Sequence, residues 1–224
     1  MINLDNYHLL QQALVSSNVK LVAVSKNQPV EMIQFVYDNG QRDFGENKAQ
    51  ELTTKQSMLP NDIQWHFIGH LQSNKIKYII PFVSLIHSVD SFKLLKEINK
   101  EAHKINRVVD CLLQIYIAKE ESKFGLDEEE LNEILKSNEF YDLKNINIKG
   151  LMGMATFTDN TSVVRQEFKC LYNLFNKIKI EYFNDKLSFS ELSMGMSDDY
   201  KIAIEEGCTM IRVGTYIFGQ RVYQ

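Results

Sequence analysis

The stretch Lys-Leu-Val-Ala-Val-Ser-Lys at residues 20–26 indicates the fold class, because this short apolar run is followed by a helical pattern. The same alternation continues along the chain and predicts eight strands, at residues 20–24, 42–44, 65–68, 84–87, 109–117, 146–151, 187–192 and 209–213. Helical patterns separate them, at residues 30–39, 48–58, 73–80, 91–105, 127–137, 162–182 and 197–206. Strands that alternate with helices pair in parallel, because each crossover connection contains a helix.

Eight such units predict an α/β fold with one domain over residues 1–224, a (β/α)8 TIM barrel. The usual length of such a barrel is about 250 residues, so this chain has short loops and no room for a second domain. Three prolines and the absence of a Ser/Gly tract also argue against a linker. The competing interpretation is a doubly wound open sheet, but the glycine-rich turn that typically follows its first strand is missing here.

The composition argues against several classes of function, namely nucleic-acid binding, membrane insertion and metal binding. The net charge is -4, and no cluster of basic residues indicates a nucleic-acid or membrane surface. No apolar run approaches the ~18 residues of a membrane span, and the first residues lack a signal-peptide pattern, so we expect a cytoplasmic protein. The pair His66 and His70 has no third ligand nearby in the sequence, so we expect no metal site.

In a barrel of this kind the functional residues lie where the strands end, at the carboxyl face. The first strand ends at Lys26. One interpretation is a lysine that points into solvent. The functional interpretation is an amine held near apolar walls, where it can attack a carbonyl group.

The ends of the seventh and eighth strands indicate a phosphate site. Ser197 is expected to be the N-cap of the following helix, where free N–H groups suit a phosphate, although the adjacent Asp198 and Asp199 would repel one. Strand alternation turns Arg212 into the barrel if its apolar neighbours pack on the helices, and Gly214 and Thr215 then add backbone N–H groups. The loops after strands seven and eight often bind phosphate in TIM barrels.

Five segments together resemble the YggS/PROSC family of pyridoxal 5'-phosphate (PLP) homeostasis proteins. They are Val-Ala-Val-Ser-Lys at 22–26, Phe-Gly-Glu-Asn at 44–47, Trp-His-Phe-Ile-Gly-His-Leu-Gln-Ser-Asn-Lys at 65–75, Leu-Ser-Met-Gly-Met-Ser-Asp-Asp at 192–199 and Ile-Arg-Val-Gly-Thr at 211–215. The match keeps its order over nearly the whole chain. It implies a fold similar to the N-terminal barrel of alanine racemase.

The resemblance also implies the role of each site residue. PLP would bind Lys26 as a Schiff base, and its phosphate would lie against Ser197 and the backbone of Gly214 and Thr215. Arg212 would face the pyridine nitrogen. Asn47 would lie beside the ring, and Met154 would line the pocket.

The function expected from this resemblance is PLP carriage in vitamin B6 and amino-acid homeostasis, with little or no catalysis. Arg212 can only donate to the ring nitrogen, which would weaken the ring as an electron sink. The alternative is a small PLP-dependent racemase with a base inside the barrel, such as Tyr116 or His70. A phosphate-binding barrel enzyme without PLP is a third possibility. The expected partners are PLP, free amino acids and recipient apoenzymes, and we expect a monomer.

Overall fold

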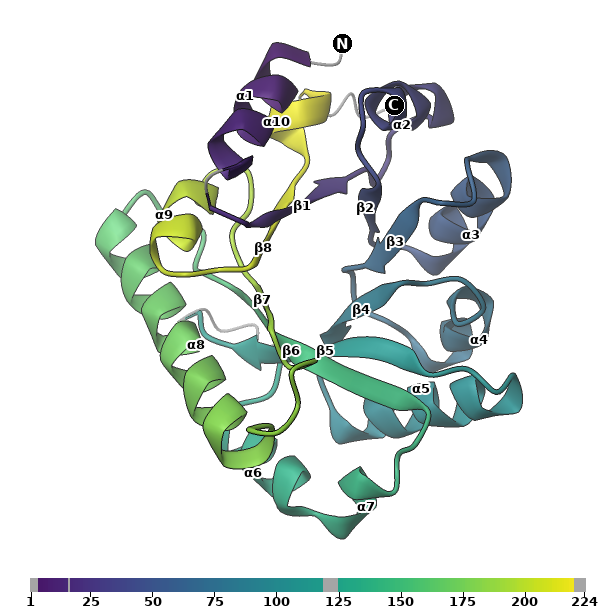
Figure 1. Cartoon of the computed structure of the whole chain (residues 1–224), viewed down its shortest axis with the longest axis vertical. Coiled ribbons are helices and arrows are strands. Elements are labelled where there is room, and N and C mark those ends of the chain that lie inside the picture. Colours follow the sequence, from purple (N-terminus) through teal and green to yellow (C-terminus); the bar gives the residue numbers. More distant parts are fainter. Residues whose placement is uncertain (1–3, 16, 119–124, 220–224) are drawn as a thin grey trace.

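The chain forms a closed barrel of eight parallel strands surrounded by helices (Figure 1). This computed structural model describes residues 4–15, 17–118 and 125–219. The strands are β1 (Lys20–Val24), β2 (Asp43–Glu46), β3 (Gln64–Phe67), β4 (Leu85–Val89), β5 (Val109–Tyr116), β6 (Ile146–Met154), β7 (Glu191–Ser193) and β8 (Met210–Val213). Each strand pairs with its neighbour in sequence, and β8 closes the barrel against β1. The predicted TIM barrel is confirmed, and the open sheet is excluded.

Helices cover the outside of the sheet. They are α1 (Leu4–Val15), α2 (Val30–Asp38), α3 (Ala49–Met58), α4 (Ile76–Ile79), α5 (Phe92–Lys104), α6 (Glu128–Lys136), α7 (Asn138–Tyr141), α8 (Thr161–Tyr182), α9 (Tyr200–Glu205) and α10 (Thr215–Phe218), with a short 3-10 turn η1 (Ser73–Lys75) before α4. The sequence patterns did not predict α1, α7 or α10. Of these, α1 is the largest omission, and it packs beside α10, where the side-chain amide of Asn6 donates to the carbonyl of Tyr216 at 3.1 Å.

Local signals account for several helix ends. Asp127 accepts from the backbone N–H of Glu130, whose side chain accepts in turn from the N–H of Asp127, which is a capping box at the start of α6. Ser91 is the N-cap of α5, where its side chain accepts from the backbone N–H of Leu94. The apolar face of α5, which includes Leu95 and Ile98, is buried against the sheet. No helix within the described part of the chain is both long and apolar enough to cross a bilayer.

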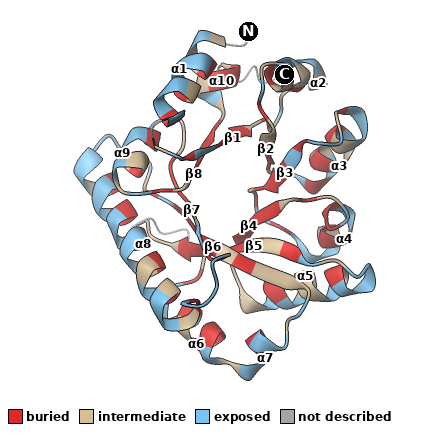
Figure 2. Cartoon of the chain, in the orientation of Figure 1, coloured by how far each residue is buried: buried red, intermediate tan, exposed pale blue. Residues whose placement is uncertain are grey.

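The barrel separates two apolar regions. The large core lies between the sheet and the helices, where the strands are largely buried (Figure 2). A smaller cluster fills the inside of the barrel and consists of Val22, Leu85, Leu112, Met152 and Met210. The barrel interior is therefore packed with side chains at the level of these residues, and it is not an open channel.

Candidate functional site

The carboxyl ends of the strands bring the predicted site residues to one mouth of the barrel. Lys26 follows β1 and Asn47 follows β2, while Met154 ends β6. Ser197 lies in the connection from β7 to α9, and Gly214 follows β8 directly. Because all eight strands are parallel, these five positions share one face, as a TIM-barrel site requires.

The turn that carries Lys26 is held by a buried ion pair. Nζ of Lys55 on α3 donates to Oε1 of Glu46 at 2.7 Å and to the carbonyl of Ser25 at 2.7 Å. The hydroxyl of Ser25 donates to the same carboxylate oxygen at 2.6 Å. On the other side of Lys26, the backbone N–H of Asn27 donates to Glu51, which also binds Lys55. Both neighbours of Lys26 in the chain are thus tied to β2 and α3, while Lys26 itself is half-buried.

The burial of Glu46 is electrostatically unfavourable. Its carboxyl group is fully buried, and burial raises its pKa to about 6 in spite of the positive charge of Lys55 and the two hydrogen bonds. Its second oxygen, Oε2, has no hydrogen-bond partner among the described residues. The carboxyl group is ionised at neutral pH because Lys55 lies beside it. Loss of Lys55 would leave a buried charge without a partner, which is strongly destabilising.

The loops after β7 and β8 meet beside the end of β1. The hydroxyl of Ser197 accepts from the backbone N–H of Gly214 at 3.4 Å. A Cβ built on Gly214 would lie 3.0 Å from the carbonyl oxygen of Val24, so the β8 end fits tightly against β1. Thr215 begins α10, and the first N–H groups of a helix have no partner inside it. The hydroxyl of Ser197 and the start of α10 therefore lie together at one corner of the mouth, next to the Lys26 turn.

The predicted capping role of Ser197 is wrong. Helix α9 begins at Tyr200, and its N-cap residue is Asp199. Oδ1 of Asp199 accepts from the backbone N–H of Met196 at 2.5 Å, which closes the loop on itself. The hydroxyl of Ser197 is directed across to Gly214 instead, so it belongs to the junction between the two loops.

Gly195 makes this loop possible. Its φ is +90°, a conformation that residues with a side chain rarely adopt. A Cβ at this position would also lie 2.5 Å from the Cβ of Ala203 on α9. The carbonyl of Gly195 accepts from the backbone N–H of Arg212 at 3.0 Å, which ties the loop to β8.

Arg212 lies inside the barrel, as strand alternation predicted. Its side chain is buried and donates from Nη1 to the hydroxyl of Ser193 at 2.6 Å and from Nη2 to the carbonyl of Gly153 at 3.0 Å. Burial lowers its pKa to about 10, and the charge of Asp199 opposes that shift. The guanidinium therefore stays positively charged at neutral pH and can only donate hydrogen bonds.

Asn47 supplies a polar atom without a partner. Its side-chain oxygen Oδ1 is buried and accepts no hydrogen bond within the described ranges. Gly69, after β3, packs directly against the Asn47 backbone, and a Cβ at Gly69 would overlap the Asn47 carbonyl. The lack of a side chain at position 69 therefore lets the chain pass close to Asn47. A buried acceptor left open in this way suits a bound polar molecule.

The remaining predicted residues lie at the edge of the mouth. Met154 is 39% exposed at the end of β6, where it pairs in register with Tyr116 of β5. His70 is exposed, and its ring nitrogen Nδ1 lies 3.1 Å from Asp90. Tyr116 thus shares the mouth with the other candidates, whereas His70 pairs with a carboxylate at the surface.

The family follows from comparison with known proteins. The family model for the alanine racemase N-terminal domain matches residues 4–222. A pyridoxal phosphate homeostasis protein of Aquifex aeolicus is 41% identical over 205 residues, which cover 91% of this chain and 88% of the relative. One of Synechocystis is 40% identical over 212 residues, which cover 94% and 95%. The chain belongs to the pyridoxal phosphate homeostasis protein family.

Solved structures of related proteins have the same fold as this member of the homeostasis family. PipY of Synechococcus elongatus, in a structure with PLP bound, is 35% identical and superposes with a TM-score of 0.85, covering 96% of this chain and 99% of PipY. The same protein without PLP gives a TM-score of 0.89. Alanine racemase of Bartonella henselae is 16% identical with a TM-score of 0.69, and this chain covers 56% of it. That more distant likeness concerns the fold alone.

Several residues of the homeostasis-family site were missed at the level of sequence. Glu46 and Lys55 hold the Lys26 turn, and Ser193 holds Arg212, but none was singled out. One signal was present, because Glu51 and Lys55 stand four apart on a helix and can pair. The contact of Lys55 with Glu46 joins a helix to a strand, and no spacing along the chain indicates it.

Proposed function

We propose that this protein carries PLP as a Schiff base on Lys26 and takes part in intracellular PLP, or vitamin B6, and amino-acid homeostasis. The observation that carries the proposal is the junction of Ser197 with Gly214 beside the turn that holds Lys26. An amine and an anion-binding corner at the same mouth suit an aldehyde that bears a phosphate. The PLP-bound structure of PipY, which is 35% identical, supports the same assignment.

The residues at the mouth fit this cofactor. Ser197 and the backbone N–H groups of Gly214 and Thr215 would bind the phosphate, in the loops that often do so in TIM barrels. Arg212 would donate to the ring nitrogen from inside the barrel. The open acceptor Oδ1 of Asn47 would lie beside the ring, and Met154 would cover the pocket edge.

We further propose that the protein has little or no catalytic activity. Bound PLP supplies an electron sink for carbanions, which is stronger when its ring nitrogen is protonated. Arg212 keeps its own proton and would act only as a donor to that nitrogen, which would leave the nitrogen unprotonated. The chain would thus bind and protect the cofactor without promoting proton removal from an amino acid.

A racemase of the small single-domain type is the second candidate, and the position of Tyr116 favours it. This phenol lies at the same mouth as Lys26, paired in register with Met154. It could serve as a base on one face of a substrate. Incubation of the PLP-loaded protein with single-enantiomer amino acids in deuterated water separates the two functions, because rapid deuterium uptake at the α-carbon would refute PLP carriage without catalysis, and formation of the other enantiomer would identify a racemase.

The setting that we propose is the cytoplasm. The protein would act there as a monomer, with residues 1–224 as one PLP-binding barrel. Free amino acids and PLP-dependent apoenzymes that receive the cofactor would be its partners.

Visible absorption of the purified protein tests the central proposal. A Schiff base between PLP and a lysine absorbs in the visible range, and borohydride reduction removes this band and fixes the cofactor to the chain. Peptide mapping after reduction should then identify Lys26. Attachment to another lysine, or no attachment after incubation with PLP, would refute the proposal.

A further inference from the structure

A chain of hydrogen-bonded side chains crosses the inside of the barrel. Its links are Asp43 Oδ1 to His66 Nε2 at 2.9 Å, His66 Nδ1 to His87 Nε2 at 2.9 Å, His87 Nδ1 to Ser193 Oγ at 3.0 Å and Ser193 Oγ to Arg212 Nη1 at 2.6 Å. The members come from β2, β3, β4, β7 and β8. Because β4 and β7 are not neighbours in the barrel, the link between them crosses its interior.

When both imidazoles are neutral, the two ends of this chain fix the direction of every hydrogen bond. A carboxylate can only accept, so Nε2 of His66 carries a hydrogen and donates to Asp43. In a neutral imidazole the other nitrogen of His66 then accepts from Nε2 of His87. Nδ1 of His87 is left as an acceptor for the hydroxyl of Ser193. That hydroxyl accepts in turn from Arg212, which can only donate.

The surroundings of His87 favour the neutral form that this arrangement needs. Its side chain is completely buried, and burial lowers its pKa well below the usual value. The positive charges of Arg212 and Lys20 act in the same direction, as would a charge on His66. With His66 and His87 both neutral, each donor in the chain meets one acceptor, and no other placement of the protons satisfies both ends.

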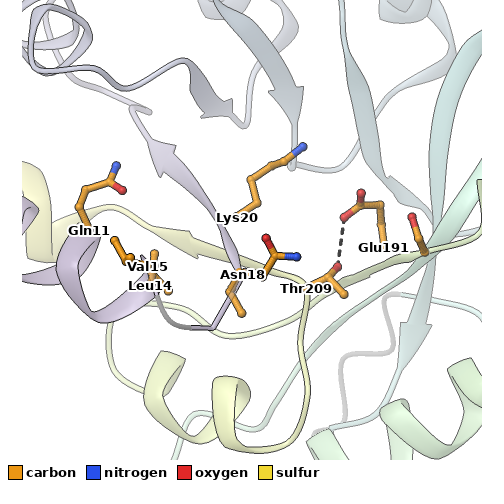
Figure 3. A pocket seen from close by; sticks show the side chains of 9 residues that line it. Gln11, Leu14, Val15, Asn18, Lys20, Glu191 and Thr209 are labelled. Carbon is orange, nitrogen blue, oxygen red and sulfur yellow. Dashed lines mark hydrogen bonds between the residues drawn. The ribbon is translucent and has the colours of Figure 1, made fainter.

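The chain begins at the face of the barrel opposite to the candidate site. The Asp43 side chain is 22% exposed, and its Oδ1 lies 3.9 Å from Nζ of Lys20. Lys20 lines a pocket of about 550 Å³ at the amino ends of the strands, together with Glu191 and Thr209 (Figure 3). The other end of the chain is Arg212, below the mouth that holds Lys26. The hydrogen bonds thus connect the two faces of the barrel.

We propose that Asp43, His66, His87 and Ser193 are positioning residues that hold the Arg212 guanidinium in one orientation toward the PLP ring. The proposal rests on the proposed function for its cofactor. The proposal has one distinctive consequence: a change at Asp43, which lies at the opposite end of the barrel, alters how PLP binds at the mouth.

Nitrogen NMR of the histidine rings tests the proton arrangement in the protein without PLP. We expect His66 and His87 both to be neutral with the hydrogen on Nε2. Asp43→Asn keeps the side-chain shape but also offers a donor, so the form with the hydrogen on Nδ1 should appear in both rings. Glu191→Gln is the matched control, since it changes a half-buried carboxylate at the same face outside the chain. It should leave both rings unchanged.

PLP titration, followed by the visible band, tests the effect on Arg212. Ser193→Ala removes one of the two acceptors of the guanidinium, and we expect about tenfold weaker binding, because hydrogen bonds to charged groups are the stronger class. Asp43→Asn should weaken binding about two- to tenfold, the range of one neutral hydrogen bond, and shift the band. Ser88→Ala is the control for the serine. It deletes an equally buried hydroxyl, bonded to the carbonyl of Gly69, from the outward side of β4.

The outcomes separate this inference from the proposed function. If the unaltered protein binds no PLP, the proposed function fails, and the assignment of the chain to PLP positioning fails with it, whatever the ring nitrogens show. If PLP binds but Asp43→Asn behaves like Glu191→Gln in both affinity and spectrum, the positioning chain is refuted and PLP carriage stands. A charged His87, or one with its hydrogen on Nδ1, would also overturn the inference.

Discussion

Replacing Lys55 with methionine tests the ion pair that holds the Lys26 turn. Its Nζ lies 2.7 Å from Oε1 of Glu46, and the two side chains are only 6% and 0% exposed. Removal of one partner leaves the other charge buried and uncompensated, which costs about 3–5 kcal/mol. For a domain of this size each 1 kcal/mol lowers the melting temperature by about 2–4 °C, so we expect a loss of roughly 6–20 °C.

The pH dependence of this loss identifies its cause. The pKa of Glu46 is raised from 4.5 to about 6 in the folded protein, so between these values the folded state binds more protons than the unfolded state. This group's contribution to the free energy of unfolding therefore falls as pH rises through that window, by ~2 kcal/mol in total. Without Lys55 the pKa rises further, so the deficit of the variant should be larger at pH 7 than at pH 5.

Urea unfolding of both proteins across this pH range provides the measurement. Lys96→Met is the matched control, because it breaks an exposed pair with Glu139 and should cost less than about 1 kcal/mol. Adding Glu46→Gln to the Lys55 variant should restore much of the stability, since the buried charge is then gone. A deficit that stays the same at every pH, or one as small as that of the control, would refute the reasoning.

Four other changes test the site and its supports. Lys26→Ala should abolish the visible PLP band with little change in melting, because a half-buried residue in a turn contributes little packing; a large loss of stability would argue against this view. Arg212→Met should cost about 1–3 kcal/mol and weaken PLP retention, since Ser193 and Gly153 lose their donor, and unchanged melting would contradict it. Gly195→Ala should lower the free energy of unfolding by at least about 1–3 kcal/mol, because an alanine is strained at this positive φ, and calorimetry would measure the loss. The same variant should bind PLP more weakly in a titration. Asp127→Ala should cost ~1 kcal/mol in thermal unfolding without affecting PLP.

Much of the barrel could be predicted because its signals are local. The first strand was expected at residues 20–24 and is β1, Lys20–Val24. The helix expected at 127–137 is α6, whose capping box lies within four consecutive residues. Helix α1 was missed, although Tyr7, Leu10 and Leu14 are spaced three and four apart and form its buried face. This spacing is a local signal of an amphipathic helix, so α1 could have been predicted from the sequence.

The parts that sequence reasoning misplaced depend on contacts between distant segments. Ser197 matched the preferred chemistry of an N-cap, but Asp199 occupies the N-cap position of α9, and the hydroxyl of Ser197 instead accepts from Gly214, seventeen residues away. Likewise, the link from His87 to Ser193 spans 106 residues. Strand alternation could place each polar side chain on the inner face. It could not indicate which of them would meet across the interior.

The anchoring of the Lys26 turn has a consequence for ionic strength. Salt weakens attraction between charges that water reaches, with a screening length of about 8 Å at physiological concentration, but it scarcely affects a pair enclosed by protein. Surface ion pairs such as that of Arg165 with Glu205 should weaken at high salt concentration, whereas the buried ion pair of Lys55 with Glu46 should persist. Lys26, to which we propose that PLP attaches, would then keep its position both in dilute buffer and at high salt concentration.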